Sequence, residues 1–136
     1  MAMNGSDSGS GLDAVMNAHP QLNAFGIGAF DSRKKSPEER RAYLADGRAA
    51  LKRREAMVMK VTAWLRANIS PIKTPSVGSY RMKHVAERAL AEYVSNGELI
   101  AAALIAGYPV KYSEGPNANL GMSKRDVDSV DARRSS

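Results

Sequence analysis

The chain of 136 residues contains 43% hydrophobic and 25% charged residues, which is ordinary for one globular domain with flexible ends. It contains no cysteine, so disulfides, thiolate metal sites and thiol chemistry are excluded. A formal net charge of +6 and a pI near 9.8 favour an acidic partner.

The N-terminal part of the chain carries few signals for regular structure. Residues 1–11 are rich in Gly, Ser, Asn and Asp, and we expect a disordered tail there. This stretch lacks the apolar centre of a signal peptide, so a cytoplasmic location is the simplest expectation. Residues 12–35 are predicted to form a loosely ordered segment, with a short helix before His19 and then a loop whose aromatic side chains pack onto the main body.

A long helix is predicted over residues 37–68. Ser36, followed by proline and by Glu39 three residues on, is a strong helix start with a capping box. Apolar residues then recur at helical spacing and form one broad face. Gly47 lies on this face, and there we expect the helix to bend, to break or to let a neighbour approach. Arg54 lies on the same face and is expected to reach its edge or to pair with a carboxylate.

The positive charge is concentrated in residues 33–66, which carry eleven basic and four acidic side chains, a net charge of +7. Helical spacing arranges six of the cations in two stripes beside the apolar face. The first stripe contains Arg41, Arg48, Lys52 and Arg66, and the second contains Arg53 and Lys60. Such a row suits a phosphate backbone. It equally fits a solvated basic surface on an amphipathic helix.

Two further helices are predicted after a proline-containing linker at residues 69–78. Ser79 caps the first, over about residues 80–94. Its inward-facing positions are Met82, Val85, Ala86, Ala89, Leu90 and Tyr93. The second helix lies within residues 95–109 and is apolar on every side, so it belongs inside the domain and is too short to span a membrane.

The order of elements in the second half predicts a winged-helix-like arrangement. The two helices follow each other closely, as in a helix-turn-helix. Residues 110–112 and 117–122 are predicted to form a β-hairpin. The expected fold is therefore mainly α, with a long basic amphipathic helix, a helix-turn-helix-like pair and a short C-terminal β-hairpin. We expect a single helical domain over residues 36–125 and a tail over residues 126–136. Ser123 and Asp126 are expected to cap a last helical turn at this boundary.

The apolar helix is poorly suited to read a DNA sequence. Base edges are read by polar side chains, whereas residues 97–106 offer alanine, leucine and isoleucine with Glu98 as the one charge. Phosphate contacts, which position a protein without specifying sequence, are therefore expected from basic side chains. The nine candidates are Arg41, Arg48, Lys52, Arg53, Lys60, Arg66, Arg81, Lys83 and Arg88.

The sequence lacks the patterns of common catalytic and metal sites. His84 and Glu87 share a helical face, but two ligands do not make a structural metal site, and Arg81 and Arg88 beside them disfavour a cation. A phosphate loop, a dinucleotide fingerprint and a nucleophile elbow are absent. We therefore expect no enzymatic activity, no catalytic or metal-ligating residue and no cofactor.

The C-terminal half contains several distinctive short segments. They are Ile-Lys-Thr at 72–74, Ser-Tyr-Arg-Met-Lys-His at 79–84, Tyr-Val-Ser-Asn-Gly at 93–97, Ile-Ala-Ala-Ala at 100–103, Ala-Gly-Tyr at 106–108, Gly-Pro-Asn at 115–117 and Gly-Met-Ser at 121–123. This combination resembles small uncharacterised proteins of bacterial phages, plasmids and integrative elements, over about residues 70–125. The resemblance implies a mobile-element or host-interaction setting and supplies no catalytic residues.

Two functions of different classes are compatible with these patterns. The first is a small accessory or regulatory protein of a mobile element that binds DNA or RNA through its basic helix, by phosphate contacts without strong sequence readout. The second is a protein–protein interaction module on the helix-turn-helix-like scaffold. Such a module either self-associates through the face of Tyr43 and Leu44 or binds an acidic partner, as an inhibitor or antagonist of a host or element protein. No membrane partner is expected.

Overall fold

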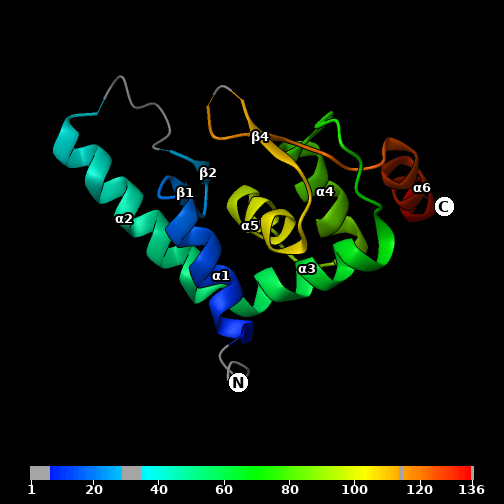
Figure 1. The fold of residues 1–136 in the computed structure, drawn as a ribbon, viewed down its shortest axis with the longest axis horizontal. Coiled ribbons are helices and arrows are strands. Elements are labelled where there is room, and N and C mark those ends of the chain that lie inside the picture. Colours follow the sequence, from blue (N-terminus) through cyan, green and yellow to red (C-terminus); the bar gives the residue numbers. More distant parts are fainter. Residues whose placement is uncertain (1–6, 29–34, 114, 136) are drawn as a thin grey trace.

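The fold is mainly helical, with two small antiparallel sheets (Figure 1). The computed structural model describes residues 7–28, 35–113 and 115–135. Its helices are α1 Asp7–Ala18, α2 Pro37–Arg53, α3 Glu55–Asn68, α4 Ser79–Leu90, α5 Asn96–Ala106 and α6 Lys124–Ser135. Its strands are β1 Leu22–Asn23, β2 Gly26–Ile27, β3 Val77–Gly78, β4 Val110–Tyr112 and β5 Ala118–Leu120.

Helix α5 lies at the centre of the molecule, where α1, α3, α4 and the β1–β2 hairpin contact it (Figure 1). Every residue from 96 to 103 is buried, which confirms the predicted internal position of this apolar helix. Its start is the predicted capping box: Ser95 accepts from the Glu98 N–H, and Glu98 accepts from the Ser95 N–H. Gly107 ends the helix in the left-handed conformation, with φ 90°.

The predicted long helix is interrupted at Arg54, so α2 and α3 run in different directions (Figure 1). The capping box of Ser36 and Glu39 at the start of α2 is confirmed. At the break, the Arg54 side chain donates from Nε to Glu98 Oε2 at 2.8 Å, and Glu98 is 2% exposed. This pairing confirms the carboxylate alternative for Arg54. The break lies seven residues after Gly47, and a neighbouring element approaches the glycine instead.

That neighbour is the β1–β2 hairpin, which is wedged between α2 and the start of α5. Asn23 is completely buried. A Cβ added at Gly97 would lie 1.8 Å from the Asn23 carbonyl oxygen, and one added at Gly47 would lie 2.8 Å from Asn23 Oδ1. Backbone hydrogen bonds hold both sides, from the Ala24 N–H to Gly47 O and from the Gly97 N–H to Ala24 O. Glycine is therefore required at Gly97, where backbone meets backbone, while at Gly47 an added Cβ would collide with the Asn23 side chain.

Residues 12–28 are thus integral to the core rather than the loosely ordered segment that we expected. The predicted short helix before His19 is present as α1. Leu12 and Leu22 are completely buried, and Met16 is 8% exposed. Helix α1 already begins at Asp7, inside the stretch expected to be a disordered tail. Residues 1–6 and 29–34 lie outside the described residues.

The C-terminal hairpin is confirmed and belongs to a three-stranded sheet. Strand β5 pairs antiparallel with β4, in the register Val110↔Leu120 and Tyr112↔Ala118. It also pairs antiparallel with β3, in the register Val77↔Leu120, so the strand order is β3-β5-β4. The short strand β3 was not predicted, because two residues are too few for a periodic signal.

Helix α6 replaces most of the predicted C-terminal tail. The Ser123 hydroxyl accepts from the Asp126 N–H, as in an N-cap, so the predicted last helical turn is present and continues to Ser135. Val127 and Val130 are 0% and 4% exposed and join the core. Two valines are a weak apolar pattern, which explains why the sequence suggested only one turn.

We predict that Gly97→Ala destabilises the protein by about 3 kcal/mol or more, because the new methyl group meets the backbone of Asn23. Gly11→Ala is a matched control on α1. Its Cβ would lie 3.7 Å from Ile105, an ordinary contact, so helix propensity should make it neutral or stabilising by up to about 1 kcal/mol. Urea unfolding followed by circular dichroism measures both variants. Equal free energies of unfolding for the two variants would contradict the close contact between Gly97 and Asn23.

Candidate interaction surface on helix α4

The structure places most of the nine predicted cations in contacts within the protein. Seven of them donate to a carboxylate or to a backbone carbonyl: Arg48, Lys52, Lys60, Arg66, Arg81, Lys83 and Arg88. Arg41 and Arg53 are exposed on α2, and no acceptor contacts them within the described part of the chain. The nine cations therefore do not form one free basic surface.

The first predicted stripe is divided by the bend at Arg54 and is partly covered by α1. The Arg48 guanidinium donates to four carbonyl oxygens between the last turn of α1 and the start of β1, at 2.9 to 3.1 Å: those of Met16, His19, Pro20 and Leu22. Lys52 pairs with Asp13 on the same helix. Arg66, on α3, donates instead to Ile105 O at 3.2 Å. The C-terminal end of α1 is negatively polarised, so the Arg48 guanidinium stabilises it.

Three other predicted cations, Lys60, Lys83 and Arg88, lie near two exposed tyrosines on the outer side of α4. Tyr80 is 59% exposed and Tyr93 is 64% exposed, the highest values among the large hydrophobic side chains of the described residues. Lys83 Nζ lies 5.9 Å from the ring centre of Tyr80 and 5.2 Å from that of Tyr93. Lys60 pairs with Glu92 next to Tyr93, and Arg88 lies beside the same tyrosine.

Lys83 holds this group of side chains together. It was predicted to lie on the surface, but it is 9% exposed, because the two tyrosine rings and the carboxylate of Glu87 cover it. Glu87 accepts from Lys83 at 3.2 Å and from the Val94 N–H at 3.2 Å, and it contacts His84 Nδ1 at 3.0 Å. At these distances the Lys83 ammonium attracts both ring faces, which is worth about 0.5–1 kcal/mol at an exposed site and restrains the two rings.

The pKa of Glu87 is lowered from its ordinary value of 4.5. Burial acts to raise this pKa, but the Val94 N–H and the Lys83 ammonium outweigh burial because both favour the ionised carboxylate. The charged form of Glu87 is therefore part of the folded structure. It joins α4 to the segment that carries Tyr93.

Tyr93 is exposed because α4 ends before it. The sequence predicted a helix to about residue 94, in which Tyr93 faces inward, but α4 ends at Leu90. Ala91 adopts the left-handed conformation there, with φ 56° and ψ 37°. The helical spacing is lost at that point, and Tyr93 turns outward. A shallow hollow of about 430 Å³ opens beside it, lined by Glu87, Arg88, Ala91, Glu92 and Tyr93.

The start of α5 and the hairpin turn are covered by the N-terminal segment. The Asn96 side chain donates to Phe25 O at 3.3 Å and to Pro116 O at 3.1 Å. The Ile27 N–H also donates to Pro116 O, at 3.0 Å. On β4, the Tyr112 hydroxyl contacts His19 at the end of α1. Because α1 and the β1–β2 hairpin occupy these positions, α5 has no face open to a large ligand.

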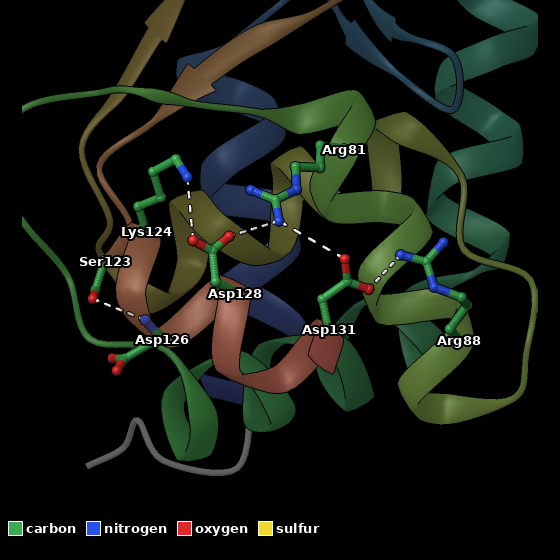
Figure 2. Close-up of polar contacts among 7 residues, drawn as sticks. All are labelled: Arg81, Arg88, Ser123, Lys124, Asp126, Asp128 and Asp131. Atoms are coloured by element: carbon green, nitrogen blue, oxygen red, sulfur yellow. Dashed lines mark hydrogen bonds and ion pairs between the residues drawn. The ribbon is translucent and has the colours of Figure 1, made fainter. Parts of the chain in front are cut away.

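Arg81 and Arg88 lie on the side of α4 that faces α6 (Figure 2). Arg81 pairs with Asp128 at 2.8 Å and lies 3.8 Å from Asp131, while Arg88 pairs with Asp131 at 2.6 Å. The pKa of Asp128 is lowered, by Arg81 first and then by Lys124, because both favour its charged form. These ion pairs set how α6 lies against α4.

Sites of other kinds were sought in the same residues. Among the described residues, no three His, Asp or Glu side chains gather closely enough to hold a metal ion. In the same part of the chain, every helix is too short or too polar to cross a bilayer. Comparison of the sequence and fold with family models, curated proteins and solved structures gave no match.

We predict that Glu87→Gln destabilises the protein by about 1–2 kcal/mol at pH 7, because glutamine keeps an acceptor but loses the charge that Lys83 faces. The pKa of Glu87 is lowered on folding, so its contribution is present above about pH 4.5 and is lost as the pH falls through the folded-state pKa. Urea unfolding at pH 7 and pH 3 measures the free energy of unfolding of variant and wild type. The difference in this free energy should be smaller at pH 3 than at pH 7. An equal difference at both would contradict a charge effect.

We also predict that Ala91→Gly stabilises the protein by about 1 kcal/mol, because glycine adopts the left-handed conformation without the steric cost that alanine bears. Thermal unfolding measures the change. Ala132→Gly is the control, because Ala132 lies inside α6 in an exposed position, where glycine should destabilise by up to about 1 kcal/mol.

Proposed function

We propose that this chain is a non-enzymatic, winged-helix-like module that binds a protein partner through the outer side of α4. The scaffold part of the proposal is supported by the order α3, β3, α4, α5, β4, β5 and by the strand order β3-β5-β4. A helix, a short strand, two closely linked helices and a hairpin follow each other in the same way in a winged helix.

One observation carries the choice of a protein partner. The helix that would read DNA in a winged helix is buried, whereas Tyr80 and Tyr93 are held in place on an open surface by Lys83. Tyrosine and arginine are the residue types that dominate binding energy at protein interfaces. Because the rings are already fixed, binding would cost little side-chain entropy.

The local charge balance also favours a protein over a nucleic acid at this surface. Each cation near the tyrosines has a carboxylate partner: Lys60 with Glu92, Lys83 with Glu87 and Arg88 with Asp131. A polyanion would have to replace these carboxylates. We therefore place the module in the role of a regulator or antagonist of a host or element protein, the setting that the sequence resemblance suggests.

Nucleic-acid binding by phosphate contacts is the second candidate, and a different surface favours it. Arg41 and Arg53 lie on α2, and no carboxylate contacts them within the described residues. Twelve residues of helix separate them by about 18 Å. The whole chain also carries a net charge of +6. These cations would position a phosphate backbone without reading its sequence.

The proposed protein partner is tested by affinity capture from the cells in which the chain occurs, with nuclease added. We expect to capture a protein whose recovery does not change when nuclease is added. The captured amount should fall at least tenfold with the double substitution Tyr80→Ala and Tyr93→Ala. Phe25→Ala is the matched control, because Phe25 is also an exposed aromatic residue, at 55%, but lies in the turn between β1 and β2. This substitution should leave capture unchanged. Equal capture by both variants would refute the proposed surface.

The nucleic-acid candidate is tested by fluorescence anisotropy with labelled duplex and single-stranded oligonucleotides across a range of salt. It requires binding at low salt and a steep loss of affinity as salt rises. The slope of the logarithm of the binding constant against the logarithm of the salt concentration should be smaller by about 2 in the double substitution Arg41→Ala and Arg53→Ala. The protein-binding proposal expects no such binding. Tight, salt-dependent binding that both arginines support would favour the second candidate.

A further inference from the structure

A second surface, separate from Tyr80 and Tyr93, lies beneath α6. We propose that the seam between α3 and α4 is a binding groove for an acidic amphipathic helix of a partner protein, and that α6 is the occupant that this helix replaces. The inference rests on the proposed function only in taking the partner to be a protein.

Helix α6 is a weak occupant of this groove. Of its twelve residues, Val127 and Val130 are the ones whose side chains are buried among those described. Neighbouring positions such as Arg125 and Ser129 are exposed. Two valines remove little apolar surface from water, so packing holds α6 less firmly than it holds α3 or α5.

The surface beside α6 is also not filled completely. An open cavity of about 200 Å³ that faces solvent remains where α3, α4 and α6 meet, lined by Trp64, Asn68, Ala89, Val130 and Arg133. A helix that carried leucine, isoleucine or phenylalanine in place of Val130 would fill part of the cavity and gain contacts that α6 lacks.

The charges at the edge of the groove define the partner's chemistry. Arg81 and Arg88 receive Asp128 and Asp131, which lie three residues apart on one helical face (Figure 2). Both arginine side chains are more than 40% exposed, so these pairs add little net stability and mainly fix orientation. A partner helix with two acidic residues at the same spacing would meet the same arginines.

The start of α6 is attached more firmly than its end. The Ser123 N–H donates to Ser70 O at 2.9 Å, and the Ser70 N–H donates to Asp126 at 2.8 Å. Met122, just before the helix, is completely buried. In the proposed exchange α6 therefore pivots about Ser123 while the sheet and α5 stay closed. Such a pivot uncovers the groove without unfolding the domain.

The experiment uses the full chain and a fluorescein-labelled peptide of residues 123–135 with Val127→Leu and Val130→Leu. The receptor is the chain with Asp128→Lys and Asp131→Lys, whose own α6 no longer pairs with Arg81 and Arg88. We expect this receptor to bind the peptide at least tenfold more tightly than the wild-type chain does, by anisotropy. Trp64 is the single tryptophan of the chain and lines the cavity, so its emission should change on binding.

Two controls make the outcome specific. A peptide with lysine at both aspartate positions should bind at least tenfold more weakly, and so should a receptor that also carries Arg81→Glu and Arg88→Glu. Failure of the folded receptor to bind the acidic peptide would overturn the proposal. If the receptor does not fold, excess acidic peptide is titrated into the wild-type chain, and the absence of a saturable change in Trp64 emission would overturn it.

The proposed groove and the proposed tyrosine surface can be refuted separately. The double substitution Tyr80→Ala and Tyr93→Ala should leave peptide binding within twofold of the unsubstituted receptor. Loss of peptide binding in that variant would refute a separate groove. Capture of a partner that depends on the tyrosines, together with no peptide binding, would leave the proposed function intact and remove the groove.

Discussion

The ion pair between Arg54 and Glu98 connects the main parts of this fold. Glu98 is almost completely buried, and a buried carboxylate is costly unless it is paired and hydrogen-bonded. Arg54 supplies the charge from the junction of α2 and α3, and its guanidinium also donates to Tyr93 O at 3.0 Å. The same two side chains therefore fix the bend between two helices, the start of α5 and the segment that presents Tyr93.

The parts of the fold that the sequence predicted correctly depend on local signals. The capping boxes at Ser36 and Ser95 lie within four residues, and the hairpin of β4 and β5 is formed by neighbouring segments. The parts that it missed depend on distant contacts. Nothing near Asn23 indicates that it fits between Gly47 and Gly97, and nothing near Arg54 indicates that a carboxylate 44 residues away ends the helix there.

The candidate site was harder to predict for a related reason. A count of charges finds cations but not their partners, so Arg48 was assigned to a phosphate-binding stripe when it holds the end of α1. Lys83 was named among the nine, but its burial between two tyrosines depends on where α4 ends. That end is set by Ala91 in a conformation usually adopted by glycine, so the sequence carries no stop signal there.

The position of the β1–β2 hairpin between α2 and α5 has a consequence for folding during synthesis. The Asn96 side chain donates to Phe25 O across 71 residues, so the β1–β2 hairpin cannot take its place until the start of α5 has been synthesised. Long-range contacts of this kind slow folding and leave apolar surface uncovered in the meantime. Leu12, Met16 and Leu22, which the finished fold buries, would be exposed throughout that interval, so a chain cut short before residue 96 presents an apolar N-terminal helix to solvent.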